Sequence, residues 1–184
     1  MEEIHINNIV ATASISDKLN LKLINEIVPN SEYNKKRFPG LIYRQKMPKT
    51  ALLIFSSGKV VCTGAKTMKE AKKAILNVID LLSKFQIHLN KKPIISVQNI
   101  VATSSLHAEL NLSTIAISLG LENVEYEPEQ FPGLVYRVFD PKVVFLIFKS
   151  GEIVCTGAKS VEDINTAVKI LKNELFLAGF INES

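Results

Sequence analysis

The sequence contains few of the residues that build metal centres, disulfides or catalytic thiol sites. Its 184 residues include two cysteines and three histidines. Cys62 and Cys155 show no Cys-x-x-Cys or Cys/His spacing, and two cysteines are too few for a disulfide framework. His5, His88 and His107 are scattered and have no paired carboxylates. We therefore expect no metal, no cofactor and no enzymatic activity.

Long apolar runs are also absent. No segment approaches the ~20 apolar residues that a membrane helix needs, and the start of the chain is acidic rather than signal-like. The chain is 47% hydrophobic and 22% charged, which is typical of a globular protein with a sizeable core. These features predict a soluble intracellular protein without a membrane partner.

A glycine-rich phosphate loop is likewise missing. The segment from Ser57 to Thr67 has its two glycines separated by five residues, and Ala65 precedes its lysine, so the loop's spacing is not met. The same residues fit a β-hairpin followed by the start of a helix.

What the chain does contain is an internal duplication. Residues 8–12 read Asn-Ile-Val-Ala-Thr and recur at 99–103. Residues 38–67 match residues 131–160 at 19 of 30 positions. This similarity predicts two half-domains, residues 1–91 and 92–184, related by an approximate twofold axis. Such symmetry suits duplex DNA or a dimeric protein partner.

The two repeats differ in charge. Residues 1–91 carry 15 Lys/Arg and 7 Asp/Glu, a net charge of +8, whereas residues 92–184 carry 7 and 11, a net charge of −4. The overall charge of +4 is compatible with nucleic-acid binding but does not establish it.

Each repeat predicts the same order of elements. In the first repeat, residues 4–13 alternate as a strand does, and Ser16 is expected to cap a helix from Asp17 to about Val28. Two extended segments flank the Phe-Pro-Gly turn at 38–40, and a hairpin spans residues 51–65 with its turn at 56–59.

A long helix should close each repeat. Thr67 and Glu70 form a candidate capping box, replaced in the second copy by Ser160 and Asp163. Apolar residues then recur at helical spacing in both copies: Met68, Ala71, Ile75, Val78 and Leu82, and Val161, Ile164, Val168, Leu171 and Leu175. The order of elements predicts an α+β fold in which helices cover one face of a single antiparallel sheet.

The second face of this sheet is predicted to be apolar as well. Alternation along the hairpin places Leu52, Ile54, Val60 and Cys62 on one face, and Leu53, Phe55, Val61 and Thr63 on the other. A sheet with helices on one side usually has a polar second face, so something should cover this one. A second helical layer or a dimer interface is one explanation; a shallow ligand such as a widened DNA minor groove is the other.

Polar residues repeated in both copies favour the DNA explanation. Asn8 and Asn99 can donate to the minor-groove acceptors of A·T pairs, and Thr63 and Thr156 have the same capacity with less reach. Cations that suit phosphates also occur in pairs: Arg44 and Arg137, Lys66 and Lys159. Each residue alone has an ordinary structural explanation, because a strand Asn is often a bulge residue and a Lys at a helix start is usually solvated.

These motifs resemble the TATA-box-binding protein family over essentially the whole chain. The resemblance rests on the two Asn-Ile-Val-Ala-Thr segments, the two Phe-Pro-Gly-Leu-(Ile/Val)-Tyr-Arg segments, and the hairpins at 53–66 and 146–159. It implies a pseudo-twofold saddle of about ten antiparallel strands with helices on the convex face. The short N-terminal region and the Phe-Pro-Gly turns resemble archaeal members, which implies a cytoplasmic, nucleoid-associated protein of an archaeal cell.

The resemblance also implies a role for each matching residue in binding and bending AT-rich promoter DNA through its minor groove. The implied wedges between base steps are Phe38, Phe55, Phe131 and Phe148. The implied groove-floor and base-edge residues are Asn8, Asn99, Thr63, Thr156, Val10, Val101, Val61, Val154, Leu53 and Leu146. The implied phosphate contacts are Arg37, Arg44, Ser57, Lys59, Lys66, Arg137, Ser150 and Lys159. Glu152 stands where Lys59 stands in the first copy, so that phosphate contact is in doubt.

The resemblance implies protein partners as well. The basic segment at 34–37 becomes acidic at 127–130, and in the family the acidic turn docks transcription factor B, which then leads to RNA polymerase. This role would fall to Glu127, Glu129 and Gln130. The strongest competing hypothesis is a non-enzymatic interaction module that dimerises through its apolar face, and a homodimer without DNA stays open. A nucleic-acid enzyme with a similar sheet would need a further catalytic domain.

Overall fold

The chain folds into two compact units that follow the duplication. A computed structural model describes residues 4–90 and 92–182. One unit comprises Asn8–Gln98, here the first-repeat unit; the other comprises Asn99–Ser184 together with Met1–Asn7, here the second-repeat unit. Packing thus groups residues 4–7 with the second repeat, while the division at 91/92 remains a proposal about the duplication.

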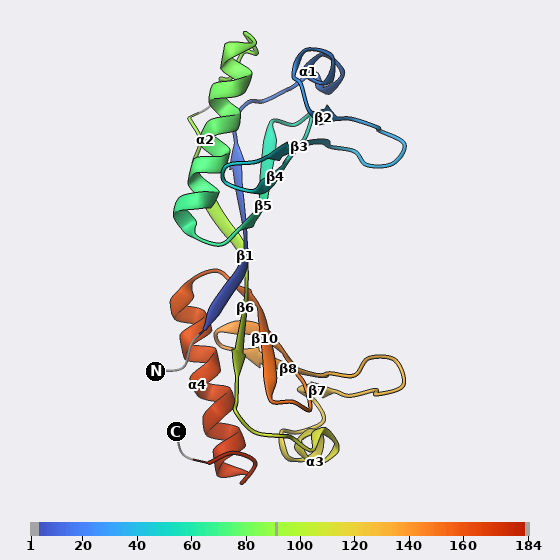
Figure 1. Cartoon of the computed structure of the whole chain (residues 1–184), viewed down its shortest axis with the longest axis vertical. Helices are drawn as coiled ribbons and strands as arrows, with labels where there is room; N and C mark the ends of the chain where they lie inside the picture. Colours follow the sequence, from blue (N-terminus) through green and yellow to red (C-terminus); the bar gives the residue numbers. More distant parts are fainter. Residues whose placement is uncertain (1–3, 91, 183–184) are drawn as a thin grey trace. The chain divides into compact units, whose positions relative to one another are not determined.

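In the first-repeat unit, an antiparallel sheet lies against a long helix (Figure 1). Its strands pair in the order β2-β3-β4-β5-β1. The elements in chain order are β1 (His5–Ser14), α1 (Leu21–Ile27), β2 (Ser31–Glu32), β3 (Leu41–Gln45), β4 (Thr50–Ile54), β5 (Lys59–Ala65) and α2 (Met68–Lys84).

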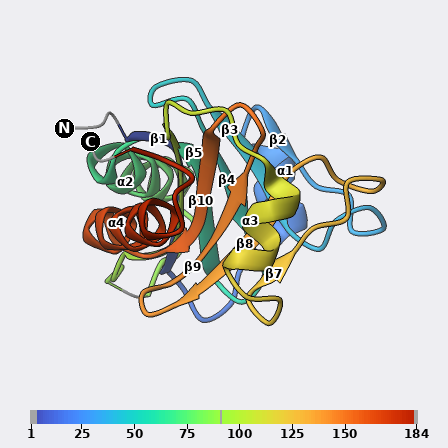
Figure 2. The same cartoon turned by 90° about the horizontal axis from the view of Figure 1, so that it is seen from below.

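The second-repeat unit has the same sequence of elements and pairs its strands in the order β6-β10-β9-β8-β7. In Figure 2, α4 lies along one face of β9 and β10. The elements are β6 (Ser96–Ser105), α3 (Leu112–Ser118), β7 (Val124–Glu125), β8 (Leu134–Phe139), β9 (Lys142–Ile147), β10 (Glu152–Ala158) and α4 (Val161–Leu177). Helices and antiparallel strands therefore occur in both units as predicted.

The long helices bury one face of each sheet. Leu52, Ile54, Val60 and Cys62 are fully buried, which confirms the predicted alternation in the hairpin. The helical stripe is buried from Ala71 onward and from Ile164 onward in the second copy. The stripe was wrong at its first position in each copy, because Met68 and Val161 are the first residues of their helices and are exposed.

The caps of the long helices differ slightly from the prediction. Ser160 and Asp163 form the full capping box, with each side chain bonded to the other residue's backbone amide. Thr67 accepts a bond from the amide of Glu70 at 3.1 Å, but the Glu70 carboxylate accepts from Lys66 rather than Thr67. Both arrangements satisfy amides that the first helical turn leaves without partners.

The predicted start of the first helix was wrong. The N-cap is Asn20, whose side chain accepts from the amide of Leu23, and the helix begins at Leu21 rather than Asp17. The amides of Ile15 and Leu19 instead donate to carbonyls of the hairpin turn, at 2.9 and 2.8 Å. This long-range pairing holds the irregular segment 15–19 against the turn, and Asn111 caps α3 in the same way as Asn20 caps α1.

The hairpin turn approaches this segment so closely that only glycine fits. Gly58 has φ +78°, and a Cβ added there would lie 2.0 Å from the carbonyl oxygen of Ser16. Gly151 repeats the arrangement against Ala108, with a Cβ at 2.3 Å from its carbonyl oxygen. The turn and the start of the first helix are therefore fixed together in each unit.

We predict that Gly58→Ala destabilises the fold far more than Gly179→Ala. Both glycines have φ +78°, but Gly179 has nothing within 4 Å of an added Cβ. The left-handed conformation alone should cost about 1 kcal/mol in Gly179→Ala, and the backbone clash should add at least ~2 kcal/mol in Gly58→Ala. Urea unfolding of both variants measures this difference. Equal losses would show that the turn is free to move away from Ser16.

Candidate nucleic-acid interface

Opposite the helix-covered face, each unit presents a second face of half-buried side chains. Within the described residues, no helix covers this face in either unit (Figure 1). In the first-repeat unit, cross-strand pairing aligns Ile42, Leu53, Val61 and Thr12 in one row. The corresponding row in the second-repeat unit is Val135, Leu146, Val154 and Thr103. The open face is therefore a largely apolar strip that contains the predicted floor residues Leu53, Val61, Leu146 and Val154, while Val10 and Val101 are half-buried in their strands.

Four residues of this strip were not among the predicted site residues: Ile42, Val135, Thr12 and Thr103. Ile42 and Val135 are half-buried and pair with predicted floor residues, Leu53 and Leu146. The signal was the alternation within 41–45 and 134–139, which places them on the same face as Arg44 and Arg137.

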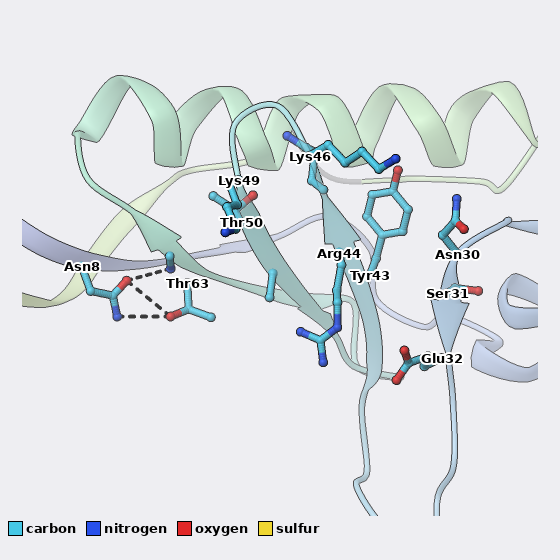
Figure 3. A pocket seen from close by; sticks show the side chains of 13 residues that line it. Asn8, Asn30, Ser31, Glu32, Tyr43, Arg44, Lys46, Lys49, Thr50 and Thr63 are labelled. Carbon is cyan, nitrogen blue, oxygen red and sulfur yellow. Dashed lines mark hydrogen bonds between the residues drawn. The ribbon is translucent and has the colours of Figure 1, made fainter.

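A second row across the open face carries the polar groups. Arg44 pairs with Ala51, and Ala51 pairs with Thr63, beside which lies Asn8. These side chains line a cavity of about 1060 Å³ together with Lys49 and residues at the sheet edge. Figure 3 shows the Asn8 amide turned toward Thr63, and Arg44 and Tyr43 projecting from opposite sides of β3. Lys49 was not predicted from the sequence, although Lys142 repeats it at the same offset as the Phe-Pro-Gly motif.

Asn8 and Asn99 each sit at a β-bulge. The amide of Gly64 donates to Oδ1 of Asn8 at 2.7 Å, and the amide of Gly157 donates to Oδ1 of Asn99 at 2.7 Å. Strand pairing shifts register at both places. Both asparagines thus stabilise a bulge, which is the ordinary structural explanation for an asparagine in a strand.

The bulge also orients each amide group. Because a backbone N–H must meet an oxygen, Oδ1 points to the glycine and Nδ2 is turned to the threonine hydroxyl, 3.2 Å away in both copies. One of the two Nδ2 hydrogens serves that contact. The planar amide directs the other away from Oδ1.

Phenylalanines form an edge-to-face pair in each unit. The ring centroids of Phe38 and Phe55 are 5.9 Å apart at 62°, and those of Phe131 and Phe148 are 5.9 Å apart at 67°. All four rings are partly exposed; Phe131 retains 38% of its surface. Edge-to-face contact stabilises such pairs beyond simple burial. The structure thus brings each predicted pair together near the hairpin turn.

The glycine of each Phe-Pro-Gly motif makes room for these rings. A Cβ on Gly40 would lie 2.8 Å from Cε1 of Phe38 and 3.1 Å from Cε1 of Phe55. A Cβ on Gly133 would meet the other pair at 2.7 and 3.0 Å. Neither glycine is among those with positive φ, so the motif depends on close approach rather than on backbone freedom.

The predicted phosphate contacts are all exposed, but the two copies differ in their surroundings. Arg137 forms an ion pair with Glu125 at 3.2 Å. The Ser150 hydroxyl accepts from the backbone amide of Glu152 at 3.3 Å, within its own turn. Glu152 is exposed beside it. The second-repeat unit is therefore less positive at these positions than the first, where Lys59 occupies the place of Glu152.

The basic and acidic turns have the same backbone. Arg37 and Phe38 donate to the carbonyl of Asn34 at 2.9 Å, and Gln130 and Phe131 donate to that of Glu127 at 2.9 and 3.0 Å. The predicted partner residues Glu127, Glu129 and Gln130 are all exposed. The reversal of charge therefore occurs on matching turn geometry.

The two cysteines are inert by their surroundings. Burial raises the pKa of Cys62 to about 11 and that of Cys155 to about 12, so both thiols stay protonated near neutral pH. Cys62 is buried on the face that the alternation predicts, and Cys155 is buried at the matching position of the second repeat. No group of three or more potential metal ligands occurs among residues 4–90 and 92–182. In the same ranges, no helix is both long and apolar enough to cross a membrane.

Comparison with known proteins identifies relatives of the whole chain. The family described as "Transcription factor TFIID (or TATA-binding protein, TBP)" matches residues 3–85 and 94–176, once for each repeat. The TATA-box-binding protein of Picrophilus torridus is 56% identical over 98% of both chains, and that of Archaeoglobus fulgidus is 49% identical over 97% of this chain and 98% of the relative. The solved structure titled "Methanococcus jannaschii TBP" is 50% identical, has a TM-score of 0.85, and covers 94% of this chain and 98% of its own.

These likenesses confirm the predicted α+β fold class and the resemblance on which the site residues were assigned. The matched family consists of transcription factors, which also confirms the prediction that the chain is not an enzyme. The chain belongs to the TATA-binding protein family.

Proposed function

We propose that the chain is a general transcription initiation factor that binds the AT-rich TATA box in the DNA minor groove, kinks it and recruits transcription factor B and RNA polymerase. The observation that carries this proposal is the repeated open face. In each unit, an apolar strip lies beside an oriented asparagine amide and a partly exposed phenylalanine pair. Sugar carbons and A·T base edges in a widened groove offer the complementary surface.

The phenylalanine pairs are suited to kinking DNA. Separating stacked bases costs a few kcal/mol per step in minor-groove proteins, this family's own members included. A ring inserted at the step restores part of the lost stacking. Because Phe38 supports Phe55, and Phe131 supports Phe148, each ring can be held in position before DNA arrives.

Electrostatic contacts should be stronger in the first-repeat unit. Arg37, Arg44, Lys59 and Lys66 are exposed there, and Lys49 lines the cavity beside Arg44. In the second-repeat unit, the Arg137–Glu125 ion pair must reorganise before the guanidinium binds a phosphate fully. Phosphate contacts release counterions, so affinity for DNA should fall steeply with salt.

The alternative is dimerisation through the open apolar faces without DNA. It predicts association that strengthens or stays constant with salt, because burial of apolar surface does not release counterions. Sedimentation of the protein with and without an AT-rich duplex separates the two.

We predict that Phe131→Ala lowers affinity for an AT-rich duplex about tenfold or more, given roughly 1–3 kcal/mol for each base stacked on an aromatic ring. DNA bending, measured by energy transfer between dyes on the duplex ends, should fall as well. The slope of affinity against salt should stay the same, because no charge is removed. The control is Phe176→Ala on α4, whose ring is exposed to a similar extent at 40%. Equal losses in both variants would contradict a wedge role for Phe131.

The oriented amide of Asn99 gives a separate test. Asn99→Asp keeps an oxygen for the Gly157 amide but removes the Nδ2 donor, whereas Asn99→Ala removes both. Hydrogen exchange of the Gly157 amide should stay slow in Asn99→Asp and become fast in Asn99→Ala. Both variants should lose preference for AT-rich over GC-rich duplex by about tenfold, since a base-edge contact is worth roughly 1–3 kcal/mol. An unchanged preference would leave Asn99 with its bulge role alone.

Recruitment of transcription factor B is tested by reversing charge on the acidic turn. Glu127→Lys with Glu129→Lys should weaken the ternary complex about tenfold or more and leave binary DNA binding intact, since exposed interface charges act on the partner they face. The matched control is Glu122→Lys with Glu162→Lys, two other exposed glutamates of the same repeat. Parallel loss of binary and ternary binding would refute a docking role for the turn.

A further inference from the structure

A lysine-lined groove lies in the first-repeat unit between α1 and the loop that follows β2. It consists of two adjoining cavities of about 480 and 350 Å³, which share Lys22 and Tyr33. Figure 1 shows α1 beside β2, from which this loop leaves the sheet. We call it the α1 groove. Its lining comprises Lys18, Leu19, Asn20, Leu21, Lys22, Asn25, Glu26, Tyr33, Asn34, Lys35, Lys36 and Ser56.

The α1 groove combines positive charge with an apolar base. Lys18, Lys22, Lys35 and Lys36 are exposed, and Glu26 is the single carboxylate among the lining residues. Leu19 and Leu21 are buried and the ring of Tyr33 is half-buried. A ligand that fits must therefore present negative charge together with an apolar side chain.

The second-repeat unit contains the same groove without its charge. A cavity of about 700 Å³ is lined there by Leu110, Asn111, Leu112 and Tyr126, the counterparts of Leu19, Asn20, Leu21 and Tyr33. Glu109 replaces Lys18, and its carboxylate forms an ion pair with Lys149 at 3.2 Å. At the other lysine positions stand Ser113, Pro128 and Glu129.

This comparison shows that folding does not require the lysines. The caps Asn20 and Asn111 accept equivalent bonds at 3.2 Å, and Leu19 and Leu110 donate to their hairpin turns at 2.8 Å. The framework is the same with and without the cations. Four like charges around one hollow also repel one another, so their presence needs a reason other than stability.

The groove is separate from the residues assigned to DNA. None of the predicted wedges, groove-floor residues or phosphate contacts lines either of its cavities. Its hollows are of a size that admits individual side chains, and Tyr33 supplies a ring for an apolar one to pack on. A peptide fits this shape better than the broad surface of a duplex does.

We propose that the α1 groove binds an acidic peptide segment of another protein, with carboxylates paired to Lys18, Lys22, Lys35 and Lys36 and a leucine or aromatic side chain against Tyr33. The counterpart groove lacks these lysines, and its one carboxylate, Glu109, is paired with Lys149, so the same segment does not bind in the second-repeat unit. The shared framework thereby recruits this partner in one repeat only.

The test uses a fluorescein-labelled peptide rich in aspartate and glutamate with one leucine and one phenylalanine. Fluorescence anisotropy measures its binding to the full chain. The control ligand is a peptide of the same length in which asparagine and glutamine replace aspartate and glutamate. The groove variant is Lys22→Glu with Lys35→Glu. The charge-matched control is Lys69→Glu with Lys73→Glu, two exposed lysines on α2.

We expect the wild type and the α2 control to bind the acidic peptide alike, and the groove variant to bind about tenfold more weakly, as two lost and reversed charge contacts imply. Lys22→Gln with Lys35→Gln should show a smaller loss in the same direction, with unfolding temperatures unchanged. Tyr33→Ala should also weaken binding without changing the salt dependence.

Three results would overturn the proposal. Equal loss in the α2 control would mean that net charge alone attracts the peptide. Displacement of the peptide by an AT-rich duplex, with binding unaffected in the groove variant, would place the peptide on the open face. A groove variant that binds the peptide normally but binds duplex more weakly and with a shallower salt slope would make the lysines phosphate contacts.

Discussion

The two-residue period of the β-strands is the constraint on which the rest of this structure depends. Because successive side chains alternate, one set of hairpin residues fills the space beneath the long helix: Leu52, Ile54, Val60 and Cys62. The intervening set must then face away from that core. It is nevertheless apolar, so the sheet has one face fixed by folding and another free to bind. The aromatic pairs, the oriented amides and the cations all lie on that second face or next to it.

The sequence predicted those features whose cause is local. Alternation along strands, the helical spacing of apolar residues and the turn residues predicted the hairpins and the long helices. Because the chain is duplicated, each of these predictions could be compared between the two repeats. Prediction from the sequence failed where contact with a distant segment determines the local structure. The helix after β1 begins at Leu21 because residues 15–19 are bonded to the hairpin turn, which no local pattern near Ser16 reveals. Lys49 is a different case, since it lies just across the β3–β4 turn from Arg44 and was missed although Lys142 repeats it.

Duplication followed by divergence of charge explains why two similar units differ in what they can recruit. The backbone of the turns at 34–38 and 127–131 is held by equivalent hydrogen bonds. An asparagine side chain caps the first helix of each unit in the same way. What changed is the exposed side chains, from Lys35 and Lys36 to Pro128 and Glu129. A surface residue can change sign at little cost in stability, whereas a residue such as Gly40, enclosed by two rings, cannot change at all without moving them.

The bulge at Gly64 has a consequence for how the chain passes from sheet to helix. Along β5, Val60 and Cys62 are buried and Val61 and Thr63 face the open side, yet Ala65 is buried although strict alternation would expose it. The extra residue shifts the strand by half a period, so the chain leaves the sheet toward the covered side, where α2 begins. Gly157 produces the same shift before α4. A deletion of one residue there would direct the helix toward the face that is left for the ligand.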